Sequence, residues 1–468
     1  MKKLSERATK NWVLALAAVG SFMVALDALV VTTALSTIRL DLAASIEALE
    51  WTVNAYTLSF AVLLLTGAAL GDRFGRRRMF IAGLALFVAA SAACALSDSA
   101  GWLIAARAIQ GAGAALVMPL AMALLSVAFP PQERAKALGI FSGVTGLALI
   151  AGPVVGGAVA EGLAWRWIFW INVPVGLIAV LLVLGRVRES FGAGTALDVP
   201  GLAFMTGAAF GSVWGLMRGN SAGWASIEVV AALVAGIVLA VAFVGWELRA
   251  REPMVPMRFF GSRAFSSGIA ASFLFYASMY GVLFFMAQFL QTAQGYGPLG
   301  AGLRLLPWTA TLFIVAPVAG AMVNRMGERP FVVVGLALQT LGMAWIAWIA
   351  APGLAYAEFI APMIVTGAGV SMAMPAAQNA VLSSVAATEI GKASGTFNMF
   401  RQLGGVFGIA IVVAVFARVG GFGSAQAFST GFVAAISVSG ALSLLAAVVG
   451  MWLPGRRVAV ALQAGAKA

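Results

Sequence analysis

Long apolar stretches separated by short charged segments dominate this chain of 468 residues. A helix needs about 20 apolar residues to cross the hydrocarbon core of a bilayer. By that measure we predict fourteen membrane-spanning helices, near residues 12–36, 47–70, 79–97, 101–125, 137–160, 166–185, 199–217, 226–249, 265–292, 299–323, 330–350, 355–383, 392–418 and 427–452. Only 10% of the residues are charged, against about 25% in soluble domains. We therefore expect an all-α membrane protein.

The net charge of +12 is explained by membrane topology, without a nucleic-acid partner. If the N-terminus lies inside, most Lys and Arg residues fall on inner segments, as the positive-inside rule requires. The basic residues left on the outer side are then Arg39, Arg166, Arg218 and Arg418. We therefore expect both termini in the cytoplasm. The basic start of the chain leads into a full-length span, and we expect no cleavable signal peptide.

Several kinds of chemistry lack the residues that they need. The chain has no histidine and one cysteine, Cys94. Histidine metal sites, serine–histidine catalysis and an internal disulfide are therefore excluded. We expect no catalytic residues, no metal, no cofactor and no enzyme activity.

An internal repeat divides the chain. Residues 111–119 (GAGAALVMP) recur as residues 367–375 (GAGVSMAMP), an offset of 375 − 119 = 256. Flanking residues recur at the same offset: Glu133, Lys136 and Gly139 as Glu389, Lys392 and Gly395. Parallel repeats of this kind are typical of transporters, with the substrate site near the midplane. We predict six-helix bundles at 12–185 and 265–452, two inserted helices and a cytoplasmic linker at 186–264, and a cytoplasmic tail at 453–468.

Asp27 is the carboxylate that hydropathy places deep in the bilayer, nine residues or about 13 Å from a span end at Ser36. Ionisable residues inside a membrane usually mark a functional site. Arg107, in the fourth span, lies at a depth from which its side chain reaches Asp27. Arginine stays protonated, so Asp27 is the group expected to exchange a proton. The alternative is a static ion pair that holds the first and fourth helices together.

Several short sequence motifs in this chain are typical of one protein family. Residues 68–78 read AALGDRFGRRR, residues 103–113 read LIAARAIQGAG, and the fifth helix carries Gly139, Gly152-Pro153 and Gly156-Gly157. Further patterns are Leu26-Asp27, WTVNAY at 51–56, WRWIF at 165–169 and Asn172-Val-Pro174. In this order they resemble the major facilitator transporters, specifically the fourteen-helix drug:proton antiporter branch, over residues 10–455. The departures are Ala68 and Ala148 where the family has glycine, and Leu29, Thr32 and Ser36 in the first helix.

The resemblance implies a proton-coupled antiporter that exports amphipathic drugs, antibiotics or secondary metabolites across the cell inner membrane by alternating access. Its partners would be the small molecule, protons and membrane lipid, its energy source the proton gradient, and the functional unit a monomer. It assigns proton coupling to Asp27 and Arg107, a pliant backbone to Gly139, Gly152, Pro153 and Gly156, and a cytoplasmic gate to Asp72, Arg73, Gly75 and Arg76. Residues predicted to line the substrate cavity are Asn54, Tyr56, Gln110, Tyr280, Gln288, Asn379, Asn398 and Arg401.

Alternatives to this interpretation remain open. A proton symporter that imports a metabolite and a lipid flippase share the same fold. The glycines of the fifth helix also suit ordinary close packing, and the arginines at 76–78 suit a purely topogenic role. We expect Asp72 to pair with a cation across the bundle interface or to face a helix N-terminus. Because the second bundle has no mid-span carboxylate, we expect neutral or monocationic substrates.

Overall fold

The computed structural model describes residues 6–192, 197–386 and 389–455, and the regular structure within these ranges is helical. The first five residues and most of the predicted tail at 453–468 lie outside these ranges. The elements are α1 (Glu6–Asp41), α2 (Ile46–Phe74), α3 (Arg76–Ala95), α4 (Ala100–Ala128), α5 (Pro131–Gly162), α6 (Trp167–Trp170), α7 (Asn172–Arg186), α8 (Val199–Ala222), α9 (Ile227–Glu247), η1 (Met257–Gly261), α10 (Arg263–Thr292), α11 (Pro298–Arg304), α12 (Leu306–Thr309), α13 (Thr311–Met326), α14 (Glu328–Ile349), α15 (Tyr356–Leu382), α16 (Ile390–Val419) and α17 (Ala425–Gly450).

The described residues form 14 helical spans that are long and apolar enough to cross a membrane, which confirms the predicted number. The sixth span is broken at Ile171, between α6 and α7. Pro174 follows three residues later, and a proline has no N–H to offer the preceding turn. The tenth span is likewise divided into α11, α12 and α13, with Pro307 at the start of α12.

The first helix is longer than predicted. It ends at Asp41, 41 − 36 = 5 residues past the predicted end, so Arg39 lies in its last turn instead of in an outer loop. Asp27 is therefore 41 − 27 = 14 residues from the end of α1, or about 21 Å at the helical rise. The carboxylate lies deeper along the helix than the sequence indicated.

The chain divides into two compact units, and the boundary falls inside α8 between Gly207 and Ala208. The first unit contains α1 to α7 and the short segments Ala250–Met254 and Gly297–Leu303. The second unit contains α9, α10 and α13 to α17. Each unit has its own apolar core, which includes Phe87 and Leu120 in the first and Phe275 and Phe397 in the second.

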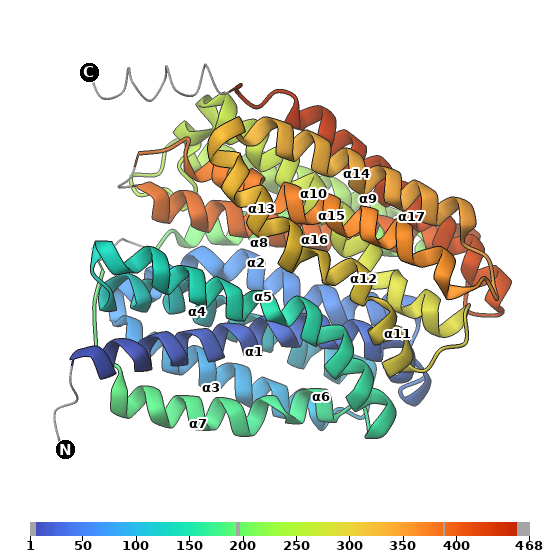
Figure 1. Cartoon of the computed structure of the whole chain (residues 1–468), viewed down its shortest axis with the longest axis horizontal. Helices are drawn as coiled ribbons and strands as arrows, with labels where there is room; N and C mark the ends of the chain where they lie inside the picture. Colours follow the sequence, from blue (N-terminus) through green and yellow to red (C-terminus); the bar gives the residue numbers. More distant parts are fainter. Residues whose placement is uncertain (1–5, 193–196, 387–388, 456–468) are drawn as a thin grey trace. The chain divides into compact units, whose positions relative to one another are not determined.

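The two units repeat one packing pattern (Figure 1). In the first unit α3 packs on α4, α1 on α5, and α3 on α7. In the second unit the corresponding pairs are α14 with α15, α10 with α16, and α14 with α17. These pairs match helix for helix under the repeat seen in the sequence. The chain therefore contains two copies of one six-helix fold.

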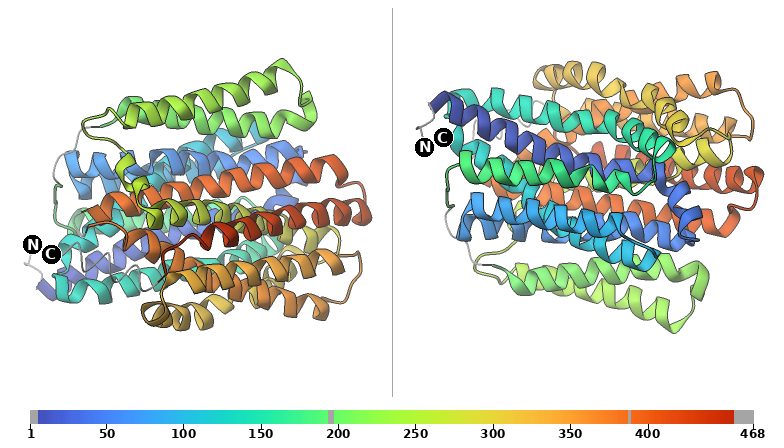
Figure 2. Two further views of the ribbon diagram at one scale, coloured as in Figure 1. Left: turned by 90° about the horizontal axis from the view of Figure 1, so that it is seen from above. Right: turned by 90° about the horizontal axis from the view of Figure 1, so that it is seen from below.

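The inserted helices α8 and α9 form an antiparallel hairpin (Figure 2). Small residues allow their backbones to approach closely, since a Cβ built on Gly211 would lie 2.9 Å from the carbonyl oxygen of Ala232. One face of α9 exposes apolar side chains at Val230, Val234, Ile237 and Val241. Such a face is expected of a helix that meets the hydrocarbon of a bilayer.

Candidate functional site

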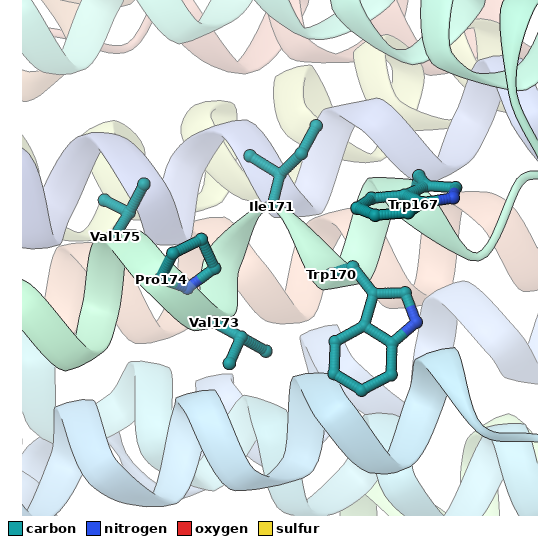
Figure 3. A pocket seen from close by; sticks show the side chains of 6 residues that line it. All are labelled: Trp167, Trp170, Ile171, Val173, Pro174 and Val175. Atoms are coloured by element: carbon teal, nitrogen blue, oxygen red, sulfur yellow. The ribbon is translucent and has the colours of Figure 1, made fainter.

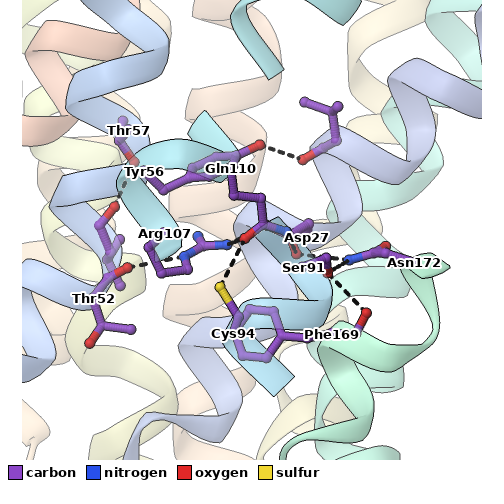
Figure 4. A network of polar contacts seen from close by, with 12 residues as sticks. Asp27, Thr52, Tyr56, Thr57, Ser91, Cys94, Arg107, Gln110, Phe169 and Asn172 are labelled. Atoms are coloured by element: carbon purple, nitrogen blue, oxygen red, sulfur yellow. Dashed lines mark hydrogen bonds and ion pairs between the residues drawn. The ribbon is translucent and has the colours of Figure 1, made fainter. Parts of the chain in front are cut away.

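The carboxylate of Asp27 lies at the centre of a buried polar network in the first unit (Figure 4). Arg107 of α4 forms an ion pair with Asp27 Oδ2, and the two side chains are 0% and 1% exposed. Asp27 Oδ1 accepts hydrogen bonds from Gln110 Nε2 at 2.8 Å and from Asn172 Nδ2 at 2.9 Å. An ionised carboxylate only accepts hydrogen bonds, so these three donors match the ionised form of Asp27.

The guanidinium of Arg107 is fixed by several further contacts. Its Nε donates to the carbonyl oxygen of Thr52 at 3.1 Å, and its Nη1 donates to Gln110 Oε1 at 2.8 Å. The guanidinium carbon lies 4.2 Å from the centre of the Tyr56 ring, a distance at which a cation–π contact is favourable. The Nη2 atom of Arg107 is buried without a hydrogen-bond partner. Several contacts therefore fix the Arg107 guanidinium beside Asp27, and its Nη2 atom is a donor that no described group uses.

Asn172 belongs to this network because of the break before α7, whose first residue it is. Its amide nitrogen also lies 3.1 Å from Ser91 Oγ, and Ser91 in turn donates to the carbonyl oxygen of Phe169 at 2.9 Å. The sequence indicated Asn172 only as part of a family pattern. Its position two residues before Pro174 was the available signal that its side chain is held at a helix break.

Of the glycines in the predicted backbone motif of α5, Gly152 and Gly156 pack closely against α1, whereas Gly139 does not. A Cβ on Gly152 would lie 2.6 Å from Leu29 Cβ, and one on Gly156 would lie 2.5 Å from the carbonyl oxygen of Val30. These glycines, with Pro153 between them, allow α5 to approach α1 within one turn of Asp27. A Cβ on Gly139 meets nothing within 4 Å, so close packing does not account for that glycine.

The predicted gate lies at the turn between α2 and α3. Arg76 binds Asp72 Oδ1 through Nε at 2.8 Å and Nη2 at 2.7 Å. Gly75 has a φ of 105°, a backbone conformation that glycine adopts readily. Arg73 is exposed, with its guanidinium 5.4 Å from the Phe74 ring. In this structure Asp72 is therefore paired inside its own motif, and its role as a latch across the bundle interface stays a prediction.

The N-terminus of α3 is capped by Glu189 and not by Asp72. The carboxylate of Glu189 accepts hydrogen bonds from the backbone N–H of Arg77 at 2.8 Å and of Arg78 at 3.2 Å. The segment after α7 also reaches the turn through Gly192, whose N–H donates to the carbonyl oxygen of Asp72 at 3.0 Å. The structure thus adds Glu189 to the motif, where it satisfies the first amides of a helix.

The residues predicted to line a cavity lie in different environments. Gln110 and Tyr56 belong to the Asp27 network, because Gln110 donates to Asp27 and the Tyr56 ring lies against the Arg107 guanidinium. Tyr56 Oη also donates to the carbonyl oxygen of Val24 at 3.1 Å. Asn54 Nδ2 lies 3.4 Å from Glu50 Oε1 on the same helix. Glu50 is itself fully buried, and sequence reasoning missed it because it lies close to the start of a span.

The remaining predicted cavity residues belong to the second unit. Gln288 and Asn398 donate to backbone carbonyl oxygens of their own helices. Asn379 is exposed near the end of α15, where its amide binds Glu328 at 2.7 Å. Arg401 lies 5.6 Å from the ring of Tyr276, whose centre is 6.3 Å from that of Tyr280. Arg401, Tyr276 and Tyr280 therefore form one cluster, whereas the amides lie apart from it.

A pocket of about 500 Å³ lies at the break between α6 and α7 (Figure 3). Its lining is apolar and comes from one short segment: Trp167, Trp170, Ile171, Val173, Pro174 and Val175. None of the predicted site residues lines it. Its walls offer an apolar surface without a charged group for a polar ligand.

Comparison with known proteins identifies the family. The model of the Major Facilitator Superfamily matches residues 17–409. The chain belongs to the Major Facilitator Superfamily. This facilitator is 36% identical over 409 residues to the tetracenomycin C resistance and export protein of Streptomyces glaucescens, covering 86% of this chain and 75% of the relative. It is 34% identical over 419 residues to the cephamycin export protein of Amycolatopsis lactamdurans, covering 88% and 86%.

Solved structures agree on the fold of this facilitator. A POT family transporter in complex with a thioalcohol-conjugated peptide superposes with a TM-score of 0.71 at 13% identity, covering 94% of each chain. The nucleoside transporter NupG gives a TM-score of 0.67 at 12% identity, covering 95% of this chain and 99% of that one. The protein is thus a multi-pass membrane transporter for small molecules and not an enzyme.

Proposed function

We propose that this facilitator exports amphipathic antibiotics or drugs in exchange for protons, with Asp27 as the proton carrier. The observation that supports this proposal is the buried ion pair between Asp27 and Arg107, which lies more than half a bilayer thickness inside α1. Export is supported by the relatives, which are named for the export of tetracenomycin C and of cephamycin. We further propose that the protein works in the cytoplasmic membrane with both termini inside, as a monomer, without a cofactor.

Proton uptake and rearrangement are coupled because protonation removes the charge that holds the contacts of Asp27. A protonated carboxyl is neutral, so the hydrogen bonds from Arg107, Gln110 and Asn172 lose the strength that the charge gave them, and the ion pair with Arg107 is lost. Loss of the Arg107 contact separates α1 from α4 at this level. Each protonation state of Asp27 therefore favours a different arrangement of these helices, as alternating access requires.

The close contact between α5 and α1 transmits a movement of α1 at Asp27 to α5. Gly152 and Gly156 place the backbone of α5 against Leu29 and Val30, the residues that follow Asp27 on α1 by less than one turn. A shift of Asp27 is thus transmitted to α5 through van der Waals contact. Pro153 lacks an N–H and weakens the helical hydrogen bonds at this place, so α5 bends there at low cost.

The direction of proton movement tests the proposal against its alternatives. We would reconstitute the protein in liposomes with an interior pH dye and impose a gradient of the dye ethidium without a pH gradient. Antiport predicts that protons move opposite to ethidium, and that a protonophore removes the pH signal. Protons that accompany ethidium would support the symporter, and the absence of coupled proton movement would contradict proton exchange and direct attention to lipid transport.

A further inference from the structure

The apolar pocket at the break between α6 and α7 has no part in the mechanism above. It encloses about 500 Å³, and its walls are six apolar side chains between Trp167 and Val175 (Figure 3). Trp167 is 49% exposed and Val175 is 39% exposed, so the pocket opens at the protein surface. Apolar walls give water no hydrogen-bond partners, and walls that face a void lose their dispersion contacts. The pocket therefore suits an apolar ligand.

The pocket lies on the exposed face of its span. The opposite face of α7 is a buried stripe that begins at Asn172, and one member, Gly176, would place a Cβ 2.1 Å from Val88 of α3. Beyond the pocket the exposed face stays apolar, with exposed fractions of 50% to 69% at Leu177, Ile178, Leu181 and Leu184. On a membrane-spanning helix such a face meets hydrocarbon. The pocket is therefore continuous with the surface that meets lipid tails.

The pocket runs along the helix from one end of the span toward its middle. Trp167 follows Arg166, which pairs with Asp41 at the end of α1 at 2.6 Å. Tryptophan side chains are enriched where a membrane meets water. From Trp167 the walls continue to Val175, 175 − 167 = 8 residues or about 12 Å along the axis. This is the course of a lipid tail that starts at its headgroup and enters the bilayer.

The wall segment also holds Asn172 in the Asp27 network. Ile171 and Val173, the two neighbours of Asn172 in the chain, both line the pocket, while the Asn172 amide donates to Asp27 Oδ1 at 2.9 Å (Figure 4). The backbone is weakly hydrogen-bonded here because Pro174 has no N–H. A ligand in the pocket therefore supports this backbone on one side, and the bond to Asp27 holds it on the other.

We propose that an acyl chain of a membrane lipid fills this pocket and keeps Asn172 in place beside Asp27. The bilayer is already apolar, so the gain is van der Waals contact with the walls and depends on the shape of the chain. When the chain does not fit, the backbone around Asn172 moves into the void and its bond to Asp27 weakens. Transport then depends on the lipid tails. This effect on transport rests on the proposed function, whereas the lipid site does not.

Photo-crosslinking tests the lipid site directly. The full-length protein is placed in liposomes with a phosphatidylcholine that carries a diazirine in one acyl chain, and adducts are mapped by mass spectrometry. We expect adducts to concentrate on residues 167–175 over residues 177–184. Val175→Trp, which fills the pocket with its own side chain, should lower them about tenfold, and Leu181→Trp is the matched control on the same face.

Three crosslinking results would overturn the lipid site. Even labelling of the two segments would show ordinary contact with the bilayer, and unchanged labelling in Val175→Trp would place the chain outside the pocket. Loss of the adducts in excess ethidium would assign the pocket to substrate.

Lipids with one headgroup and different tails test the effect on transport. Coupled exchange of protons and ethidium is compared in palmitoyl-oleoyl and in methyl-branched phytanoyl phosphatidylcholine. Wild type and Leu181→Trp should exchange several-fold more slowly with the branched tails, whereas Val175→Trp should exchange equally in both lipids. Equal slowing of all three proteins would overturn the link to Asn172. A wild type that exchanges in neither lipid would contradict the proposed function and this link, while the adducts would still decide the lipid site.

Discussion

Arg107 on α4 and Asp27 on α1 form an ion pair in which neither side chain is more than 1% exposed. The two residues are 80 positions apart in the sequence, so the pair joins two helices that are distant in the chain. Charges buried this deeply are costly unless they are paired and hydrogen-bonded. The stability of the first unit should therefore depend on both members together.

Removal of Arg107 alone should be strongly destabilising. Arg107→Met leaves the Asp27 charge buried without its cation, which typically costs about 3–5 kcal/mol. The double variant Asp27→Asn with Arg107→Met removes both charges and should recover most of that loss, although it should not transport. Thermal unfolding in detergent measures both effects. Additive losses in the double variant would show that the two residues do not form an energetic pair.

Asn172 should hold the Asp27 carboxylate in its place. Asn172→Leu removes one of the three donors to Asp27 and leaves Oδ1 with Gln110 alone. Transport should therefore fall, by about tenfold for the loss of one hydrogen bond to a charge. Ser91→Ala is the matched control, because Ser91 contacts Asn172 but not Asp27. Unchanged transport in Asn172→Leu would contradict this role.

The deep pair could be predicted from the sequence because its residues break long apolar runs. Asp27 and Arg107 each lie well inside a span, where hydropathy exposes them. The number of spans and the repeat followed from the same patterns. Glu50 and Asn172 could not be found in this way. Glu50 is near a span end, where an acid usually meets water, and Asn172 enters the network only because a helix break turns it inward.

Close contact between α5 and α1 should matter at Gly156 and not at Gly139. A Cβ at Gly156 would lie 2.5 Å from the carbonyl oxygen of Val30, whereas one at Gly139 meets nothing within 4 Å. Gly156→Ala should therefore separate the two helices and reduce transport by tenfold or more, which is about 1.4 kcal/mol. Gly139→Ala should transport normally and be slightly more stable, since alanine favours helix. Similar behaviour of the two variants in transport and unfolding assays would refute the packing argument.

Glu189 should stabilise the start of α3 in two separable ways. Its carboxylate accepts hydrogen bonds from two backbone N–H groups of α3 and also places a negative charge at the N-terminus of this helix. Glu189→Gln keeps an acceptor and loses the charge, whereas Glu189→Ala loses both. We expect the alanine variant to lose about 1 kcal/mol and the glutamine variant less, as measured by thermal unfolding. A glutamine variant as unstable as the alanine variant would assign the whole effect to charge.

The central claim is that Asp27 carries the exchanged proton. Its most direct test is ethidium transport into inverted membrane vesicles energised by a proton gradient, with wild type compared with Asp27→Asn. We predict that wild type transports ethidium, that a protonophore abolishes the transport, and that Asp27→Asn binds ethidium but does not respond to the gradient. Gradient-driven transport that survives in Asp27→Asn would contradict the claim and leave the buried pair a structural link between α1 and α4.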